Sequence, residues 1–319
     1  MPPSSTAMPT GSDLPHDPSW PRSGDWPSLA DAPGHLDAVL VGIGTHETSL
    51  SPTSAHTTPG AVRDALRRFS PHAADTAMPV GALRVADAGD ASDPDADEQG
   101  ATALVARAAA RARLVIVLGG DNAATVPAAL GSWGASIETA GLITLDAHHD
   151  LRDGRSNGSP VQRLLDAGLD GSRVAQIGIQ DFANSRAYAE RAREAGISVL
   201  AREDLEQRGL HEVAAEAVRV ARAGGGPVHL DVDVDVCDRS VAPGCPASVP
   251  GGISAWQLRA LIRAIVAYDE VASIDFTEVD AAADAADGRT VRLTALGVLE
   301  ALAALADRED RRFPKLRAL

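Results

Sequence analysis

Short apolar runs alternate with alanine-rich helical stretches along the chain from residue 36 onward. The apolar runs are continuously hydrophobic rather than alternating, which is typical of parallel strands that are covered on both faces. They occupy residues 38–43, 114–118, 142–145, 174–179, 197–200, 228–234 and 271–276. The helical stretches occupy residues 61–68, 100–112, 123–130, 160–167, 185–195, 211–223, 255–267 and 292–305. This order predicts one α/β domain of three layers, with a mostly parallel sheet between two layers of helices.

Two segments lack this pattern. Residues 1–35 are rich in Pro, Ser, Gly and Asp and have no apolar signal core, which predicts a flexible or surface-wrapping N-terminal arm. The rest, residues 36–319, is then a single domain. Residues 87–99 are polar and predict a solvated loop before a helix; calcium binding is the alternative, but the spacing and the closing glutamate of a calcium loop are missing.

Charge and cysteine content exclude several classes of protein. The 319 residues include 44 acidic and 29 basic ones and carry a net charge of -15, which disfavours nucleic acid or an anionic membrane as partner. Solubility is the simpler explanation of that charge. No stretch of about 18 apolar residues is present to span a bilayer. Cys237 and Cys245 have no CxxC spacing and predict a reducing, cytoplasmic setting.

Two acid-rich runs follow apolar strands: DAHHD at 146–150 and DVDVD at 231–235. In an extended strand, alternate residues point to one face, so each run is expected to aim its acids in one direction. Crowded carboxylates repel one another, and a divalent cation is the usual neutraliser. Ligands of open parallel sheets collect beyond the carboxyl ends of the strands, where these runs and the GGDN block at 119–122 lie.

The residue types indicate which cation these runs bind. Asp146, His148, Asp150, Asp233 and Asp235 offer four carboxylates and one imidazole without thiolate. This set suits Mn²⁺, with Fe²⁺, Ni²⁺ and Zn²⁺ as alternatives. Two ions sharing carboxylates, about 3.5–4 Å apart, can activate water for attack on the sp² carbon of an amide, amidine or guanidine.

Four blocks occur in order along the chain: GGDN at 119–122, DAHHD at 146–150, DVDVDVCD at 231–238 with Pro243 following, and SIDFTEVD at 273–280. They resemble the signature blocks of the arginase/agmatinase/formiminoglutamase superfamily, the ureohydrolases. The TPGAVR stretch at 58–63 also resembles an early element of that family. The resemblance implies an arginase-like αβα sandwich with about eight strands, a centre of two Mn²⁺ ions and a homo-oligomer, either a trimer or a hexamer.

The resemblance also implies roles for individual residues. The implied metal ligands are Asn122, Asp146, His148, Asp150, Asp233 and Asp235. Asp146 and Asp233 match bridging carboxylates, and Asp150 matches a ligand that also passes a proton to the leaving amine. Glu278 matches the acid that hydrogen-bonds the amidine or guanidine nitrogens. Asn122 stands where most members have a histidine, and its amide is the weaker ligand.

Departures from the family pattern indicate the substrate. Asn157 replaces a loop histidine, and residues 180–183 lack the Arg-Asp-x-Asp arrangement of arginases. Both features argue against an arginase. The GGDN block together with the loop lacking histidine resembles formimidoylglutamases, which hydrolyse N-formimidoyl-L-glutamate to L-glutamate and formamide in histidine degradation. A dicarboxylate substrate needs cations, and Arg152 and Arg155 follow the metal block. The alternative for these arginines, and for Arg163 on its helix, is solvation or pairing with nearby acids.

Two other functions remain open. One is a guanidino-acid hydrolase, such as a guanidinobutyrase, an agmatinase or an arginase-like enzyme, which would release urea. The other is a metal-poor, non-catalytic homologue that acts as a binding protein, suggested by Asn122 and Asn157. His149 is expected to be a packed or hydrogen-bonded histidine rather than a ligand, and Asp231 to surround the ligands or pair with an arginine.

Overall fold

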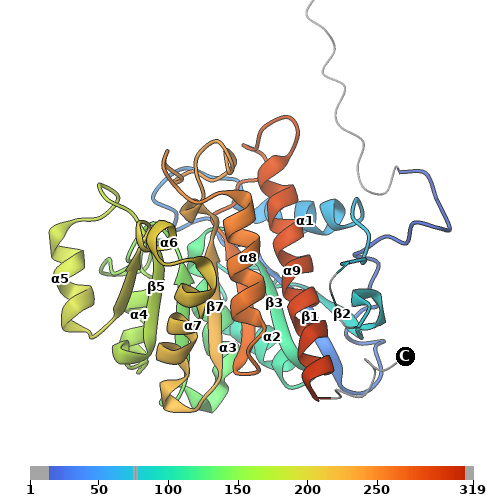
Figure 1. The fold of residues 1–319 in the computed structure, drawn as a ribbon, viewed down its shortest axis with the longest axis horizontal. Coiled ribbons are helices and arrows are strands. Elements are labelled where there is room, and N and C mark those ends of the chain that lie inside the picture. The colour runs from blue at the N-terminus through green and yellow to red at the C-terminus, as the bar shows by residue number, and fades with distance from the viewer. Residues whose placement is uncertain (1–13, 75, 77, 313–319) are drawn as a thin grey trace, which may run out of the picture.

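Eight parallel strands form one sheet in the order β2-β1-β3-β8-β7-β4-β5-β6 (Figure 1). The structure is a computed structural model that describes residues 14–74, 76 and 78–312. The strands are β1 (Leu36–Ile43), β2 (Val85–Asp90), β3 (Ala112–Gly119), β4 (Gly141–Leu145), β5 (Val174–Ile179), β6 (Ser198–Ala201), β7 (Val228–Asp233) and β8 (Val271–Thr277). The predicted three-layer architecture with a parallel sheet of about eight strands is confirmed.

Helices cover both faces of the sheet. They are α1 (Thr58–Leu66), α2 (Glu98–Ala109), α3 (Thr125–Trp133), α4 (Pro160–Asp166), α5 (Arg186–Glu194), α6 (Asp204–Gln207), α7 (Leu210–Ala221), α8 (Ala255–Val266) and α9 (Arg289–Arg312). Helices α1, α7, α8 and α9 share one apolar cluster with the sheet, whereas α2, α3, α4 and α5 pack on the opposite face. In Figure 1, α8 and α9 lie across the front, with α2 and α3 behind. No described helix is long and apolar enough to cross a bilayer.

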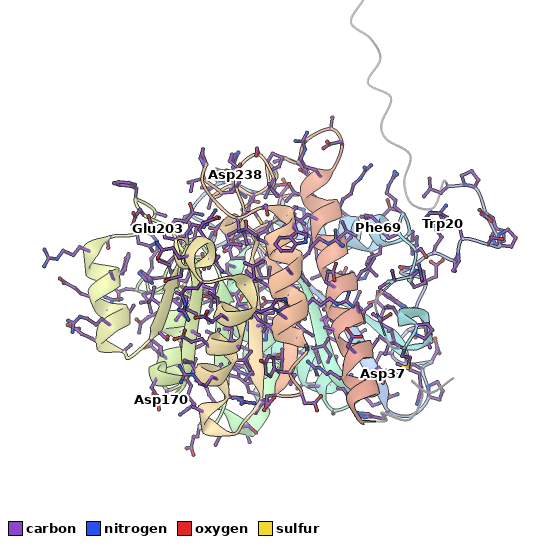
Figure 2. All side chains as sticks on the ribbon, in the orientation of Figure 1. Trp20, Asp37, Phe69, Asp170, Glu203 and Asp238 are labelled. Carbon is purple, nitrogen blue, oxygen red and sulfur yellow. The ribbon has the colours of Figure 1, made fainter. Side chains whose placement is uncertain are left out.

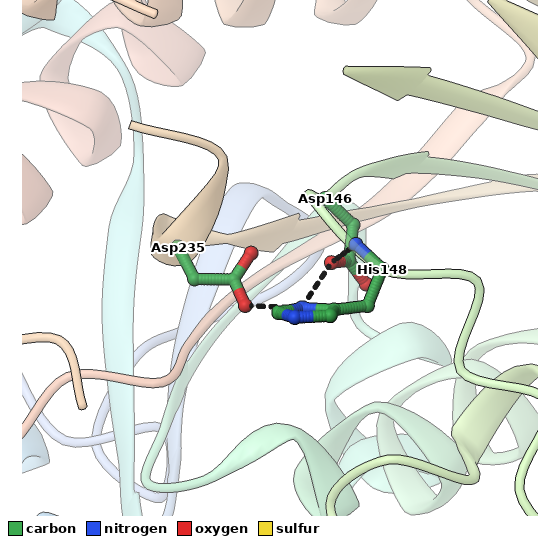
Figure 3. Close-up of side chains that lie close together, drawn as sticks. All are labelled: Asp146, His148 and Asp235. Atoms are coloured by element: carbon green, nitrogen blue, oxygen red, sulfur yellow. Dashed lines mark hydrogen bonds and ion pairs between the residues drawn. The ribbon is translucent and has the colours of Figure 1, made fainter. Parts of the chain in front are cut away.

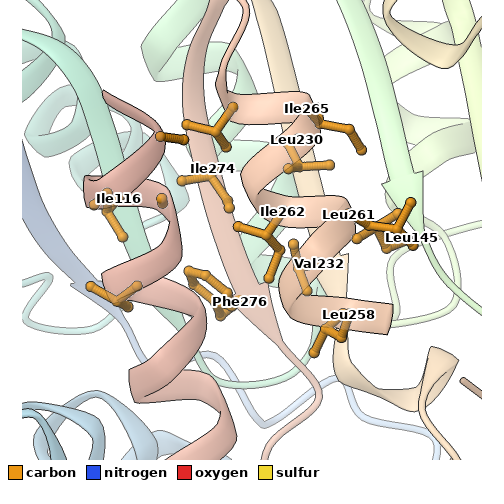
Figure 4. Close-up of a cluster of buried hydrophobic side chains, with 14 of the residues drawn as sticks. Ile116, Leu145, Leu230, Val232, Leu258, Leu261, Ile262, Ile265, Ile274 and Phe276 are labelled. Carbon is orange, nitrogen blue, oxygen red and sulfur yellow. The ribbon is translucent and has the colours of Figure 1, made fainter. Parts of the chain in front are cut away.

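The two faces of β7 differ in polarity. Leu230 and Val232 are fully buried in the apolar cluster against Leu258 and Ile262 of α8 (Figure 4). Because side chains alternate along a strand, Asp231 and Asp233 point to the opposite face. Burial of the apolar face stabilises the fold by about 25 cal/mol per Å² of area removed from water. The same packing fixes the register that holds the acids in place.

All the predicted helices and strands are present. The structure differs from the prediction where the sequence pattern of an element is weak. β2 was not predicted, because its sequence VADAGD carries two acids and it lies at the sheet edge. The solvated loop expected at 87–99 is therefore wrong at both ends: Asp87–Asp90 belongs to β2, and α2 begins at Glu98. The acids of β2 pair with Arg63 of α1, at 2.6 Å for Asp87 and 2.5 Å for Asp90.

The segment before β1 follows the β2 edge of the sheet. Leu29 N donates to Asp87 O at 2.7 Å, and Asp87 N donates to Pro27 O at 2.9 Å. Trp20, which is 52% exposed, stands clear of the sheet (Figure 2). Residues 1–13 of the expected arm lie outside the described residues. The division of the chain at residues 35 and 36 stays a prediction.

Candidate metal centre

The acid blocks meet because four strands that are distant in sequence are neighbours in the sheet. β3, β8, β7 and β4 lie side by side, and Asn122, Glu278, Asp233 and Asp146 occur at or just beyond their carboxyl ends. Parallel strands place these ends at one edge of the sheet, where ligands of such folds collect. The predicted convergence of the blocks is observed.

The reason for the convergence differs in part from the expectation. β4 ends at Leu145, so residues 146–150 form a turn rather than a strand with alternating faces. β7 ends at Asp233, and the short 3₁₀ turn Val234–Val236 brings Asp235 back beside it, with Asp235 N donating to Asp233 Oδ1 at 2.8 Å. Strand alternation therefore explains the orientation of Asp233 but is wrong for the DAHHD run, whose side chains converge through the turn.

One group of candidate ligands consists of Asp146, His148 and Asp235 (Figure 3). His148 Nδ1 lies 2.7 Å from Asp235 Oδ2 and 3.6 Å from Asp146 Oδ1. Backbone groups fix both carboxylates, since His148 N donates to Asp146 Oδ1 at 2.6 Å and Ala147 N donates to Asp235 Oδ1 at 3.0 Å. Two carboxylates and an imidazole form a suitable donor set for a divalent transition metal.

A second group consists of Asp146, Asp150 and Asp233, whose ligand oxygens all lie within 4.8 Å of one another. All three side chains are buried, and Asp146 Oδ2 has no hydrogen-bond partner among the described residues. Asp146 is common to both groups. A carboxylate that joins two sets of donors, with one oxygen unpaired, fits a centre of two cations.

Asn122 is held in a particular orientation. Its Oδ1 accepts hydrogen bonds from Thr125 Oγ1 at 2.6 Å and Thr277 Oγ1 at 3.0 Å, while its Nδ2 donates to Asp150 Oδ2 at 2.7 Å. An amide coordinates a metal through its oxygen. In this orientation the oxygen faces the two threonines and the amide nitrogen faces Asp150, and the implied role of Asn122 as a metal ligand stays a prediction.

Glu278 lies between the metal ligands and the Asn157 loop. Its Oε1 accepts from Asn122 N at 2.9 Å and from Asn157 Nδ2 at 2.7 Å, and its backbone N donates to Gly120 O at 2.9 Å. Asn157 Oδ1 in turn accepts from Leu50 N at 3.0 Å. One oxygen of Glu278 is therefore fixed by Asn122 N and by Asn157, the residue that stands where many family members have a loop histidine.

The backbone is strained at two of the predicted catalytic residues. Asp150 has φ 53°, Glu278 has φ 58°, and among the described residues other than glycine only Phe182 shares this left-handed region, at φ 64°. Such conformations are costly for a residue with a side chain and cluster at functional sites. Phe182 lies in the segment that leads to α5, directly before Ala183, which lines the cavity described below.

Crowding of buried acids shifts their protonation. Burial raises the pKa of Asp150 to about 7 and that of Glu278 to about 8. Burial, followed by the charges of Asp150 and Asp235, raises the pKa of Asp146 well above its ordinary value. Burial disfavours charge on His148, but the hydrogen bonds to Asp146 and Asp235 outweigh it and raise its pKa to about 12. These acids bind protons unless a cation neutralises them.

Asp231 lies behind this cluster rather than in it. It is fully buried, it is paired in register with Thr144 and Asp275, and none of the described arginines pairs with it. Burial, and then the charge of Asp275, raises its pKa well above the ordinary value. Of the two expectations for Asp231, a place behind the ligands is therefore observed and pairing with an arginine is not.

A cavity of about 330 Å³ opens directly onto the cluster. Among the residues that line it are His148, Asp150, Asp233, Asp235, Glu278, Asn157, Arg152, Leu50, Asn184, Ser185 and Tyr188. Leu50, Asn184, Ser185 and Tyr188 were not predicted. Little in the sequence indicated these residues, because residues 180–183 lack the motif that arginases have there. Only Ser185 could be recognised locally, as the residue that caps the start of α5.

The predicted arginines occupy different places. Arg152 lines the cavity, where its charge acts on Asp150, and it makes no ion pair with any acid in the described parts of the chain. Arg155 instead donates to Asp95 O at 2.7 Å and lies 3.6 Å from Glu98, and Arg163 pairs with Glu98 at 2.6 Å. Arg155 and Arg163 therefore have protein partners outside the cavity. Of the three arginines, Arg152 is the one that lines the cavity and could bind a substrate there.

A parallel αβα fold with a buried cluster of carboxylates and imidazole defines a class of metal-dependent hydrolases. Residues 36–304 match the model of the arginase family, and the chain belongs to that family. It is 33% identical to a formimidoylglutamase of Halalkalibacterium halodurans over 256 residues, 77% of this chain and 80% of the relative.

Solved structures agree on the fold. The crystal structure of formimidoylglutamase from Bacillus subtilis superposes with a TM-score of 0.84 at 28% identity, over 91% of this chain and 94% of that one. An Asn-to-His variant of Trypanosoma cruzi formiminoglutamase with Mn²⁺ superposes with a TM-score of 0.81 at 23% identity, over 91% and 99% of the chains. The resemblance inferred from the four sequence blocks is confirmed by the family match.

Proposed function

We propose that this chain hydrolyses N-formimidoyl-L-glutamate to L-glutamate and formamide. The observation that supports this best is that one cavity is lined by both an acidic and a basic side chain. Glu278 can hold the amidine nitrogens, and the unpaired Arg152 can hold a carboxylate. The similarity to formimidoylglutamases over most of the chain supports the same substrate.

Mn²⁺ is the proposed cofactor, with two ions per chain. Asp146, His148 and Asp235 would hold one, and Asp146, Asp150 and Asp233 the other, with Asn122 beside the second. Such ions, when bound, would lower the pKa of water and offset the charge of the acids. The described donors are oxygen and imidazole nitrogen, which suit Mn²⁺.

The protein's own residues would carry the remaining steps. Glu278, whose Oε1 is fixed by Asn122 and Asn157, would orient the amidine so that its carbon faces the metal cluster. Water adds to the formimidoyl carbon, and the bond from this carbon to the glutamate nitrogen breaks. Asp150, whose Oδ2 accepts a hydrogen bond from Asn122 Nδ2, would take the proton from water and give it to the departing amine.

The charge of Arg152 suits glutamate more than a cationic substrate. Its guanidinium carbon lies 6.0 Å from the ring centroid of Tyr188, at the wall of the cavity. Agmatine carries an amine at the corresponding end and would be repelled there. We therefore keep the guanidino-acid hydrolase as the second candidate function, restricted to substrates with a carboxylate.

The direct test is an assay of purified protein loaded with Mn²⁺. We expect formamide and glutamate from N-formimidoyl-L-glutamate, and little urea from arginine, agmatine or guanidinobutyrate. The Glu278→Gln variant serves as the matched inactive control. Urea release without turnover of formimidoylglutamate would replace the proposal with the guanidino-acid hydrolase. Less than about one ion per chain and no turnover would favour a non-catalytic binding protein.

Assembly and location are further parts of the proposal. The family resemblance supports a homo-oligomer, a trimer or a hexamer, and the two buried free cysteines suit a reducing cytoplasm. A small-molecule amidine is the proposed partner, with neither nucleic acid nor membrane. Light scattering of the purified protein would give its mass in solution and test the assembly.

A further inference from the structure

The wall of the cavity formed by the start of α5 is attached to the metal-binding turn. We call residues 146–150 the metal turn and the cavity-lining residues Ala183, Asn184, Ser185 and Tyr188 the α5 wall. Asn184 of the wall reaches the backbone of the turn: its Oδ1 accepts from His149 N at 2.9 Å, and its Nδ2 donates to Ala147 O at 2.9 Å. A second bond from Nδ2 runs to Gln180 O at 3.4 Å.

These bonds occupy both hydrogen-bond donors of the Asn184 side chain. A side-chain amide has two N–H donors, and both are directed to backbone carbonyls. Although Asn184 lines the cavity, it therefore has no donor left for a bound molecule. Its hydrogen bonds join two parts of the protein, which is the role of a positioning residue.

The turn is braced from the other side by a second side-chain amide. Gln176 of β5 is fully buried, donates from Nε2 to His149 O at 3.0 Å and lies 2.7 Å from His149 Nδ1. The N–H and the carbonyl of His149 are thus each held by a different side-chain amide. His149 is 4% exposed, which confirms the expectation of a hydrogen-bonded histidine.

Helix α5 has a second attachment further along. Arg191 Nη1 donates to Leu151 O at 2.6 Å and to Asp153 Oδ1 at 2.8 Å. The ring centroid of Tyr188 lies 6.0 Å from the guanidinium carbon of Arg152 and 5.6 Å from that of Arg191. The wall that supports Arg152 is therefore tied to the chain beside the metal turn at two points.

We propose that Asn184 is a positioning residue that sets the spacing between the metal turn and the α5 wall, and so determines how well a carboxylate-bearing amidine fits. This inference rests on the proposed function. With the metal ligands in place, moving the wall displaces the groups that meet the far end of the substrate. Binding of substrate suffers, while the reacting atoms keep their surroundings.

The test separates KM from kcat in the Mn²⁺-loaded enzyme. Asn184→Asp keeps the acceptor for His149 N and replaces the donor to Ala147 O with a repelling oxygen. We expect KM for N-formimidoyl-L-glutamate to rise about tenfold, with kcat and the Mn²⁺ dissociation constant within about threefold of wild type. Arg191→Gln should raise KM in the same direction, and the exposed Arg186→Gln on the same helix should not.

Opposite results would overturn the inference. If Asn184→Asp lowers kcat and weakens Mn²⁺ binding while KM stays constant, the residue only supports the metal turn. If that variant does not fold, Arg191→Gln decides in the same way. Wild-type turnover tests the proposed function separately: wild type active with all variants unchanged refutes only the positioning role, and wild type without turnover or binding of formimidoylglutamate refutes both.

Discussion

The two halves of the cavity are built differently. The metal half is made of Asp146, Asp233 and their neighbours, which lie at the ends of central strands and are buried. The substrate half comes from the loop that carries Arg152, from Leu50 and from the α5 wall, and Arg152 and Leu50 are exposed. The metal half is fixed by the packing of the sheet, whereas the substrate half depends on side-chain contacts between loops.

This difference indicates how the two halves should respond to mutation. Changes in the metal half should alter the rate of the chemical step or the content of metal. Changes in the substrate half should alter KM and leave the chemical step intact. The following variants test whether the halves are separable in this way.

The largest effect is expected for Asp150→Asn. Asparagine tolerates the left-handed backbone of residue 150, where φ is 53°, so the fold should persist. The amide cannot accept and return a proton, and we expect kcat to fall by about 10²–10⁴-fold. Steady-state kinetics with Mn²⁺ in excess, together with metal analysis, measures the effect. Asp181→Asn, an exposed acid beside the α5 wall, is the control. If Asp150→Asn changed KM and left kcat unchanged, the two halves would not be separable in this way.

The sequence predicted the convergence of the acidic blocks for physical reasons. The positions of acids that directly follow buried parallel strands are constrained, because the carboxyl ends of these strands lie at one edge of the sheet. The orientation of Asn122 was out of reach, since it depends on hydroxyls of Thr125 and Thr277 that are distant from each other in the chain. A sequence pattern identifies a ligand type but not the direction in which its amide points.

The substrate half was predicted only in part, because its contacts join distant loops. Arg152 and Arg155 both follow the DAHHD block within five residues, yet only Arg155 meets Asp95 and Glu98. β2 was missed for a related reason, as an edge strand with exposed acids lacks the apolar run of a central strand. In both cases the structure depends on partners that are distant in sequence: Asp95 and Glu98 for Arg155, and Arg63 for the acids of β2.

Arg152→Ala tests the substrate half. A lost charge-assisted hydrogen bond costs about 1.5–3 kcal/mol, so KM for formimidoylglutamate should rise roughly 10–100-fold while kcat changes little. Arg152→Lys should recover part of the loss, because it keeps the charge but not the planar fork. The exposed Arg186→Ala provides the matched control. An unchanged KM would remove Arg152 from the proposed binding site.

Asn122→His tests the border between the halves. Imidazole is a better metal ligand than an amide oxygen, which in this protein is held by two threonine hydroxyls. We expect the weaker of two Mn²⁺ sites to tighten by about tenfold, or ~1.4 kcal/mol, in calorimetric titration. Asn122→Ala distinguishes the gained ligand from the lost hydrogen bond to Asp150. Equal Mn²⁺ affinities in all three proteins would mean that residue 122 does not influence the metal.

The smallest expected effect is a pH dependence of stability that reverses with metal. In the metal-free protein, burial raises the pKa of Asp150 to about 7 and of Glu278 to about 8, above the value of about 4 for unfolded chains. Acids with raised pKa stabilise the fold below the unfolded value, and this stability is lost as pH rises through the folded values. The melting temperature of chelator-treated protein should therefore fall by several degrees between about pH 5 and pH 8.

With Mn²⁺ bound, the dependence should run the other way. A cation must displace protons from the acids of the metal half, so the stabilisation by a fixed concentration of Mn²⁺ should grow over the same pH range. Thermal unfolding with and without Mn²⁺ at each pH measures both trends. If Mn²⁺ stabilised the protein equally at both ends of the range, the buried acids would not be its binding site, and the distinction between the metal half and the substrate half would fail.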